Sequence, residues 1–401
     1  MVVSARPDPD AATQVLGKEV ATVNKKYDVV MAVNYYAPYI SGLTEAARIV
    51  AEALAAQGKR VLVVAGQHEP GLAKREIING VQVLRTPVLF RIGKGLISPL
   101  FVPTAIRFGR LAHVVNLHMP MIESGAIAAG LGKTPIVATY QCDISLPSSA
   151  FNSLQTVVMD TSNAIALRLS AAVVPSSDDY ARSSRLARFM VAPKEVPISP
   201  PTRLHPDGEP TFRRGAGLHV GFLGRLVEEK GLEYLVEGFR AFSDPDARLL
   251  IGGDYTKVAG GSVVETVRKL IGDDSRIELL GFLDDNQLAD FYASLDVFAL
   301  PSVNSFEAFG IVQVEAMKRG VAAIASDLPG VKTPVEETGF GVIVERRNAA
   351  AITAALTTLA ASPPDRVVGA AKANELYSEQ KTVREYAALF ASLQTRASEG
   401  R

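Results

Sequence analysis

The chain alternates short, β-branched apolar runs with longer amphipathic stretches, and this alternation occurs twice. In the first half, strand-like runs occupy residues 28–34, 61–65, 81–84, 113–117, 136–139 and 171–174. Helical patterns at 43–57, 122–131, 151–169 and 177–188 fall between several of them. Short buried strands that alternate with helices indicate βαβ units around a mostly parallel sheet.

A proline-rich break over residues 189–215 separates this half from a second alternation. Strand-like runs then return at 219–223, 248–251, 277–280, 297–300, 321–325 and 341–344. Helical patterns occupy 231–242, 262–271, 285–293, 310–319 and 348–360, and the tail over 365–396 suggests one or two amphipathic helices. The pattern predicts an α/β protein with two tandem, doubly wound Rossmann-like domains that face a cleft.

We expect four segments along the chain. They are a mobile N-terminal arm (1–26), an N-terminal Rossmann-like domain (27–200), a C-terminal Rossmann-like domain (201–375) and a C-terminal helix (376–401) that packs back on the N-terminal domain. Because ligands of such sheets lie at the carboxyl ends of the strands, the cleft between the domains is the expected active site.

Composition excludes several classes of protein. Lys plus Arg and Asp plus Glu number 42 each, and no stretch has a nucleic-acid recognition pattern. No apolar run approaches the roughly 18 residues that span a bilayer, and the first 26 residues lack a secretory signal pattern. The single cysteine, Cys142, rules out an intrachain disulfide and a thiolate metal cluster. We therefore expect a cytoplasmic, multidomain protein.

The segment 305–317 is the most informative part of the chain. Phe309-Gly310-Ile311 marks a turn that opens a helix, and a helix N-terminus offers free N–H groups to a phosphate. Glu315 lies inside this helix and could accept from a diol such as ribose, and Glu307 lies before it. Taken alone, two such glutamates are more often an acidic helix start and a solvated side chain.

Two further loops have the same placement between a strand and a helix. Arg225 and Lys230 lie in a glycine-containing loop after the strand at 219–223, where two cations form a diphosphate clamp. The alternative is a pair of solvated loop charges. In the N-terminal half, Gly42 ends the loop that follows the first strand. It allows a close backbone approach, or it only serves a turn.

With these three loops, residues 27–395 resemble the retaining glycosyltransferases of family 4 (glycosyl transferases group 1), which have the GT-B fold. The resemblance rests on Gly224-Arg225-Leu226 with Lys230-Gly231, on Glu307 and Glu315 in the E-x7-E pattern, and on the loop ending at Gly42. It implies that the N-terminal domain binds the acceptor and that the C-terminal domain binds a nucleotide sugar.

The resemblance also assigns roles. Arg225 and Lys230 bind the donor diphosphate, Glu315 binds the ribose, and Glu307 contacts the donor sugar near the reacting face. The backbone around Phe309, Gly310 and Ile311 holds sugar and phosphate, with Gly42 opposite. His118, at the end of the strand 113–117, hydrogen-bonds the donor sugar and counts with Glu307 as catalytic, whereas no role falls to His68, His113, His205 or His219.

Two segments depart from the family pattern. Ser41-Gly42 replaces the frequent paired glycines, and Ser326–Gly330 replaces the usual Gly-Gly-x-Pro-Glu.

The expected function is transfer of a hexose from a nucleotide diphosphate sugar to a hydroxyl acceptor with retention. The acceptor class stays open between a lipid-linked compound, a glycan and a small molecule. The alternatives are a nucleotide-sugar epimerase or hydrolase of the same fold, and a non-catalytic nucleotide-sugar binding protein. No cofactor and no metal are expected, because the Asp-x-Asp pairs at 8–10 and 244–246 fit solvated carboxylates better than metal ligands.

One stretch raises the question of membrane contact. Residues 77–122 contain no acidic residue, and five basic residues are interleaved there with apolar ones. A peripheral contact with the inner membrane face through residues 85–110 would suit a lipid-linked acceptor, and an ordinary domain surface over core residues is the alternative. Cys142, at another strand end, lines the acceptor side of the cleft or is a buried thiol.

Overall fold

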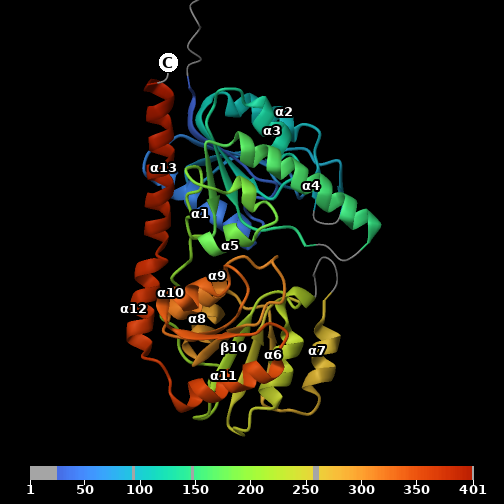
Figure 1. Ribbon diagram of the computed structural model, residues 1–401, viewed down its shortest axis with the longest axis vertical. Helices are drawn as coiled ribbons and strands as arrows, with labels where there is room; N and C mark the ends of the chain where they lie inside the picture. The colour runs from blue at the N-terminus through green and yellow to red at the C-terminus, as the bar shows by residue number, and fades with distance from the viewer. Residues whose placement is uncertain (1–24, 93–94, 146–148, 256–261, 400–401) are drawn as a thin grey trace, which may run out of the picture.

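The computed structural model describes residues 25–92, 95–145, 149–255 and 262–399. Most of the expected arm over residues 1–26 lies outside these residues. Figure 1 shows two α/β units stacked along the long axis of the molecule, with the C-terminal helix running beside the N-terminal unit. Among the described residues, no helix is long and apolar enough to cross a membrane.

The N-terminal unit is built on a seven-stranded sheet with the order β3-β4-β2-β1-β7-β8-β9. All neighbouring strands are parallel except β3, which pairs antiparallel with β4 and forms one edge. The strands are β1 (Tyr27–Ala32), β2 (Val61–Gly66), β3 (Arg75–Ile78), β4 (Val81–Thr86), β7 (Ala112–Met119), β8 (Ile136–Tyr140) and β9 (Ala172–Pro175). A separate antiparallel pair is formed by β5 (Phe90–Ile92) and β6 (Gly95–Ile97).

Helices cover both faces of this sheet, as the apolar runs on the strands require. They are α1 (Gly42–Ala56), α2 (Phe101–Gly109), α3 (Ser124–Gly130), α4 (Ala150–Leu169) and α5 (Asp178–Ser183), followed by a 3-10 turn at Ala187–Phe189. The core on one face includes residues of α2, α3 and α4, and the core on the other includes residues of α1.

The C-terminal unit repeats this architecture with a six-stranded parallel sheet of order β12-β11-β10-β13-β14-β15. The strands are β10 (His219–Leu223), β11 (Arg248–Gly252), β12 (Ile277–Gly281), β13 (Val297–Leu300), β14 (Ala322–Ser326) and β15 (Gly341–Val344). The helices are α6 (Leu232–Arg240), α7 (Val264–Ile271), α8 (Asp285–Ala293), α9 (Ile311–Lys318), α10 (Thr333–Thr338) and α11 (Ala349–Ala361), with a 3-10 turn at Glu228–Lys230.

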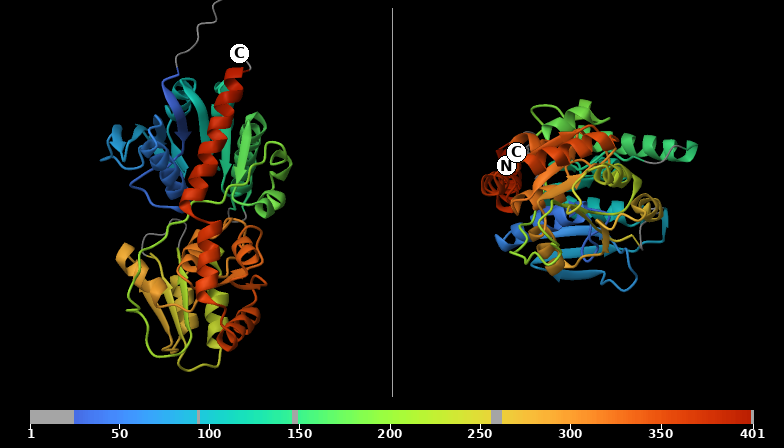
Figure 2. Two further views of the ribbon diagram at one scale, coloured as in Figure 1. Left: turned by 90° about the vertical axis from the view of Figure 1, so that its left-hand side faces the viewer. Right: turned by 90° about the horizontal axis from the view of Figure 1, so that it is seen from below.

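The last two helices, α12 (Arg366–Leu376) and α13 (Glu379–Glu399), return the chain to the N-terminal unit. Figure 2 shows them running along one side of both units. Tyr386, Phe390 and Leu393 of α13 are buried in the same core as residues of α1. The Tyr386 hydroxyl also lies 3.2 Å from Oγ1 of Thr139, in β8. The C-terminal helix is therefore an integral part of the N-terminal core.

The chain crosses between the units twice, and the two crossings lie side by side. Thr202 on the first crossing forms a parallel bridge with Ser378 on the second, and Oγ1 of Thr202 donates to the carbonyl of Tyr377 at 2.6 Å. Lys318, at the end of α9, is buried and donates from Nζ to the carbonyls of Thr202 (2.8 Å) and Tyr377 (3.4 Å). Lys318 thus joins both crossings to α9.

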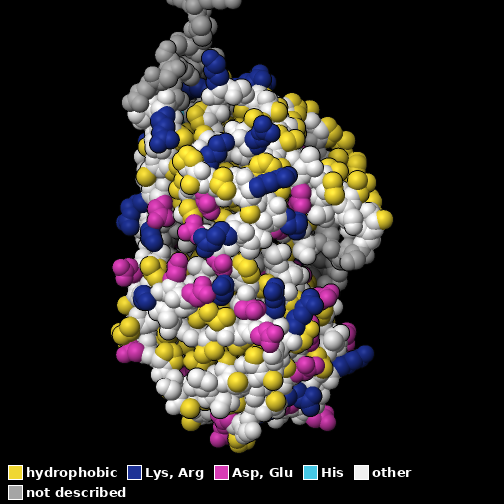
Figure 3. Space-filling model, in the orientation of Figure 1, with side chains coloured by type: hydrophobic (Ala, Val, Ile, Leu, Met, Phe, Trp, Pro, Cys, Tyr) yellow, Lys and Arg dark blue, Asp and Glu magenta, His cyan; other side chains and the backbone are white. Residues whose placement is uncertain are grey.

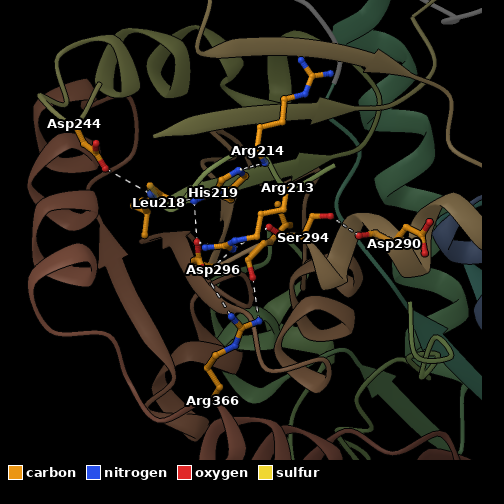
Figure 4. A network of polar contacts seen from close by, with 11 residues as sticks. Arg213, Arg214, Leu218, His219, Asp244, Asp290, Ser294, Asp296 and Arg366 are labelled. Atoms are coloured by element: carbon orange, nitrogen blue, oxygen red, sulfur yellow. Dashed lines mark hydrogen bonds and ion pairs between the residues drawn. The ribbon is translucent and has the colours of Figure 1, made fainter. Parts of the chain in front are cut away.

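A polar network closes the opposite end of the second sheet, at the start of β10 (Figure 4). Nε2 of His219 accepts from the backbone N–H of Arg214 at 2.9 Å, and its Nδ1 lies 2.8 Å from the carbonyl of Gly217. The carboxylate of Asp296 accepts from Arg213 and from the backbone N–H of His219. Both ring nitrogens of His219 are thereby used within the fold, which gives this histidine a structural role.

Candidate functional site at the domain junction

The carboxyl ends of both sheets meet where the two units touch. Oγ of Ser176, just after β9, donates to the carbonyl of Ala308 at 3.0 Å, and the Tyr180 hydroxyl donates to the carbonyl of Ser305 at 3.3 Å. On the same side, the backbone N–H of Gly330 donates to Asp179 at 3.1 Å. The segment Ser326–Gly330, where the chain departs from the family pattern, therefore serves as a contact between the units.

The N-terminus of α9 lies at this junction. Gly310, its N-cap, has φ of 79°, and a Cβ there would lie 2.4 Å from Leu300, so only glycine fits. The backbone N–H of Gly310 donates to Oε1 of Glu307 at 3.2 Å. Among the described residues, the N–H groups of Ile311 and Val312 have no acceptor, as expected for the first turn of a helix. These amides and the helix dipole together suit an anion.

Lys230 and Glu307 form an ion pair beside this helix end. Both side chains are largely buried, at 14% and 16% exposed. Lys230 is brought there by Gly231, whose φ is 63° and where a Cβ would lie 2.3 Å from the carbonyl of Pro301. Lys230 and Glu307 are 77 positions apart in the sequence, in two different loops, and the fold brings them into contact.

Arg225 lies in the same loop as Lys230 but makes a different contact. Its guanidinium pairs with Glu229 at 2.8 Å, four residues on, and 40% of its side chain is exposed. The two expected clamp cations are thus each neutralised by a separate carboxylate, and Arg225 is the more accessible of the two.

Glu315 lies one turn inside α9, on the buried side of the site, with 12% of its side chain exposed. Its Oε2 accepts from the Tyr292 hydroxyl at 3.2 Å and lies 3.3 Å from Nε2 of His205. Burial and the nearby Glu315 carboxylate raise the pKa of Tyr292 well above its ordinary value, so the hydroxyl stays a donor. Among the described residues, Oε1 has no hydrogen-bond partner and is the oxygen left for a ligand.

His205 and Tyr292 are site residues that the sequence did not reveal. His205 lies in the irregular linker, and Tyr292 lies on α8, where an aromatic residue fits the core. The ring centroids of the two lie 5.3 Å apart. No motif marks either residue, because their connection to Glu315 exists only in the folded chain.

Gly42, the first residue of α1, faces the N-terminus of α9. A Cβ added to Gly42 would lie 3.6 Å from Cδ1 of Ile311. The two glycine-bearing loops of the two units therefore approach each other directly. The side chain of Phe309 takes no part in this approach, because it is buried against Tyr377, with ring centroids 5.6 Å apart. Only its backbone is available to a ligand.

His118 occupies the carboxyl end of β7 and is 2% exposed. Neither of its ring nitrogens has a hydrogen-bond partner among the described residues. Burial lowers the pKa of His118 to about 4, so the imidazole is neutral near pH 7. Such an unpaired buried imidazole costs about 1–3 kcal/mol, and His68, 3% exposed, is in the same state.

The stretch 85–110 is a surface only in part. Arg85 is buried, pairs with Glu76 and donates to the carbonyls of Ala73 (2.9 Å) and Ala37 (2.6 Å), so its inclusion in a membrane-facing patch was wrong. A buried arginine with this many acceptors holds loops together. The exposed apolar residues of the stretch are Leu89, Phe90, Ile92 and Leu100. Cys142 is partly buried and packs against the core on the α3 face.

Comparison with known proteins supports a single family for both units. The model of the glycosyl transferase 4-like domain matches residues 41–201, and the model of the glycosyl transferases group 1 matches residues 213–375. A D-inositol 3-phosphate glycosyltransferase of Corynebacterium urealyticum is 26% identical over 61% of this chain and 60% of its own length. The chain thus spans less than two thirds of that relative.

Two other similar proteins are matched over more of their length. A GDP-mannose-dependent alpha-mannosyltransferase of Mycobacterium tuberculosis is 28% identical over 79% of this chain and 83% of its own length. The structure of a sucrose-phosphate synthase from Thermosynechococcus elongatus superposes with a TM-score of 0.75 at 20% identity, over 92% of this chain and 99% of that one. The shared architecture is the GT-B fold. The chain belongs to the family 4 (group 1) glycosyltransferases.

Proposed function

We propose that the protein transfers a hexose from a nucleoside diphosphate sugar to a hydroxyl acceptor. The observation that carries the proposal is the Lys230–Glu307 pair at the N-terminus of α9, with Glu315 one turn further along the same helix. Glu307 would contact the sugar, Lys230 and the free helix amides the diphosphate, and Glu315 the ribose.

The ion pairs of Lys230 and Arg225 fit a site that binds the diphosphate of an incoming nucleotide sugar. Lys230 and Arg225 are paired with Glu307 and Glu229, so neither cation is left without a counter-charge. A diphosphate competes for both cations, because charge-assisted bonds to phosphate are strong. When Lys230 turns to the diphosphate, the Glu307 carboxylate is released toward the sugar.

We propose retention at the anomeric carbon by front-face displacement. The bond between C1 and the phosphate oxygen breaks while the acceptor oxygen bonds to C1 on the same face, and the acceptor proton passes to the leaving phosphate. Lys230, Arg225 and the α9 amides stabilise the charge that develops on that phosphate, which is the largest expected contribution to catalysis. Glu307 supports positive charge on the sugar, and His118 orients it through a neutral ring nitrogen.

The similar proteins suggest substrate classes. Their names are a GDP-mannose-dependent alpha-mannosyltransferase, a D-inositol 3-phosphate glycosyltransferase and a sucrose-phosphate synthase. We propose a nucleoside diphosphate hexose as the donor and no metal or other cofactor.

The test is calorimetric binding of UDP-, GDP-, ADP- and TDP-sugars without added metal, followed by NMR of the product anomer. Selective binding of one nucleotide sugar and an unchanged anomeric configuration are expected. Release of free sugar without transfer would favour the hydrolase alternative, and a changed sugar on the nucleotide would favour the epimerase. Tight binding without turnover would favour a binding protein, and no binding at all would overturn the proposal.

A peripheral membrane contact is the second part of the proposal, for a lipid-linked acceptor. The exposed Leu89, Phe90 and Ile92 lie on and beside the hairpin β5–β6, with the exposed Arg91 between them. A neighbouring hollow of about 410 Å³ is lined by Lys74, Arg75 and Arg107, among others. Apolar side chains flanked by cations suit an anionic bilayer. Figure 3 shows a further apolar rim where α4 lies in Figure 1.

The measurement is co-sedimentation with vesicles of anionic and of neutral lipid. Binding to anionic vesicles only, reduced in Phe90→Glu, is expected. Equal recovery with and without vesicles would remove the membrane contact and leave the transferase proposal intact.

A further inference from the structure

The helix α4 carries an apolar face that is turned to the solvent. Its exposed large apolar residues are Phe151, Leu154, Val157, Val158, Ile165 and Leu169. With 3.6 residues per turn, these six positions lie within about one third of the helix circumference. The exposed Thr161 and Arg168 complete the face. We call these eight residues the α4 stripe, and it runs along the whole length of the helix.

The α4 stripe lies opposite the side of α4 that packs on the protein. The buried residues of the helix are Asn163, Ala166 and Leu167, which the helical repeat places about half a turn away from the stripe. On that side α4 contacts α3, where the backbone N–H of Gly125 donates to Oγ of Ser162 at 2.9 Å. A surface helix needs an apolar face only toward its own core, so the stripe is a second apolar face that the fold does not use.

The first half of α4 has little support from the rest of the chain. All three buried residues belong to the second half, and none of residues 150–162 is buried. Figure 1 shows these first turns reaching the rim of the molecule on the side away from α13, and the right-hand view of Figure 2 agrees. A helix of this length without a packed face is only marginally stable in water. A partner on the stripe would supply the missing packing.

The charges around the stripe indicate which kind of partner fits it. Residues 134–167 contain no lysine and no arginine, and the one cation of the stripe is Arg168 at its end. An anionic bilayer attracts helices through several cations, which the hairpin β5–β6 has close by and α4 lacks. The acid nearest the middle of the helix, Asp160, lies outside the stripe and pairs with Arg185 at 2.9 Å. Two copies of this uncharged face can therefore approach each other without repulsion.

The area of the stripe suits a second copy as well. The exposed parts of its six large apolar side chains sum to about 600 Å², at the upper end of the largest apolar patch on a typical monomer. Two such faces in contact bury about 1,200 Å², which reaches the range of specific protein–protein interfaces. A two-fold axis pairs a face with its own copy and closes the assembly at two chains.

We propose that the protein forms a dimer in which the α4 stripes of two copies pack against each other about a two-fold axis. Thr161 lies nearest the middle of the stripe, so in a two-fold pairing centred on the stripe it meets its own copy. Phe151 and Leu169 at the two ends then extend the contact along the full helix. None of these residues belongs to the candidate donor site, so the proposal is independent of the transferase activity.

Sedimentation equilibrium of the full chain, without ligand, measures the association. Concentrations from about 1 to 500 μM bracket the micromolar Kd that is expected of an interface this small. Wild type should pass from monomer to dimer within this range and form nothing larger. A wild type that stays monomeric at every concentration, or that forms open-ended chains, would overturn the proposal.

A glutamate in the stripe should prevent the dimer. Leu154→Glu brings two like charges into the apolar contact and should weaken the association about 100-fold or more. Because Leu154 is 62% exposed, Tm should stay close to that of wild type. The matched control is Val368→Glu on α12, at a side chain that is 63% exposed, and it should associate as wild type does. Equal association of Leu154→Glu and wild type would exclude the stripe as the interface.

A cross-link tests the geometry without disturbing the apolar contact. Thr161→Cys, oxidised with copper phenanthroline, should form a disulfide-linked dimer efficiently. Thr357→Cys on α11 is the matched control, because both threonines are exposed and donate to the carbonyl four residues before them. The native Cys142 is present in both variants. If Thr161→Cys cross-links no better than Thr357→Cys, the dimer contact lies elsewhere and the proposal fails.

Co-sedimentation with vesicles identifies the competing occupant. Binding of a monomeric wild type to vesicles that Leu154→Glu abolishes would assign the stripe to a bilayer and overturn the dimer. Dimerisation that Leu154→Glu abolishes, with unchanged vesicle binding, is the result that the proposal requires.

Discussion

Gly42 and Ile311 face each other across the junction of the two domains, with 3.6 Å between the Cβ that Gly42 lacks and Cδ1 of Ile311. Each begins a helix, α1 in one domain and α9 in the other. Two helix N-termini that point at a common space create a positive potential there. The missing side chain at Gly42 keeps that space open to a substrate.

Replacing Gly42 should therefore affect the reaction more than the fold. The backbone at Gly42 needs no left-handed conformation, and an added methyl group would make only ordinary contact, so Gly42→Ala should change Tm little. Gly42→Leu should lower the rate of transfer strongly, because its side chain fills the space opposite Ile311. Gly71→Ala, where a Cβ meets nothing within 4 Å, is the control for both kinetics and Tm. Wild-type transfer rates in Gly42→Leu would show that the substrate does not pass between these loops.

Lys230→Ala should weaken donor binding by about 1.5–3 kcal/mol, the usual value for a hydrogen bond to a charged group, or about 10- to 150-fold in Kd. The substitution removes the cation at the N-terminus of α9. It also leaves Glu307 as an unpaired carboxylate that repels phosphate. Lys269→Ala, an exposed lysine of α7, is the control for a change of net charge. Calorimetry with the preferred nucleotide sugar measures the difference, and equal affinities would remove Lys230 from the diphosphate site.

Glu307→Ala should abolish transfer and leave nucleotide affinity within a few-fold of wild type. The carboxylate pairs with Lys230 in the ligand-free state, so its removal frees that lysine for phosphate and offsets any lost contact. Single-turnover transfer assays and nucleotide titrations measure the two effects separately. A variant that transfers at nearly the wild-type rate would exclude Glu307 from the reacting face. Glu229→Gln, which only releases Arg225, should retain activity.

Tyr292→Phe should raise the KM for the donor with little change in kcat. The hydroxyl donates to Oε2 of Glu315 and leaves Oε1 for the proposed ribose contact, and loss of the hydroxyl lets the carboxylate rotate. A donor analogue that lacks the 2′-hydroxyl of the ribose provides the control, because the variant and wild type should differ less with it. An equal increase in KM with both donors would mean that Tyr292 acts only through packing.

His118 should make the protein less stable as the pH falls. Its pKa is about 4 in the folded state and near 6.5 when exposed, so the unfolded chain binds the proton first between these values. The contribution to stability is complete above pH 6.5 and is lost progressively down to pH 4, by about 3 kcal/mol over that range. Between pH 7 and pH 4.5, the free energy of unfolding measured in urea should fall less for His118→Gln than for wild type. An equal fall in both proteins would contradict the lowered pKa.

Most of the strands and helices could be predicted from the sequence, because apolar periodicity is a local signal. Three strands of the second sheet begin and end where they were expected, at 219–223, 297–300 and 341–344. The pattern failed for β3, which pairs antiparallel at an edge and has exposed residues, and for α2, whose start at Phe101 follows no capping residue. Elements that depend on tertiary contacts leave little trace in a local pattern.

Only the site residues that lie in loops after strands could be predicted from the sequence. Gly310 and Lys230 were expected at a common site, and the fold brings Lys230 to Glu307 at the helix that Gly310 begins. His205 could not be expected there, since a single histidine in a linker has no pattern. Arg85 was wrongly predicted to lie on the surface. A charged residue in a basic stretch suggests exposure, and its buried partners are visible only in the folded chain.

Lys318 ties the connection between the domains to the candidate site. Its ammonium group is bound to both chain crossings, while the other end of its helix begins beside the loop that carries Glu307. That helix is only eight residues long, so its first turn and the two crossings belong to one short, stiff segment. A displacement of the first turn of α9 would therefore also displace the point at which the two crossings are held together.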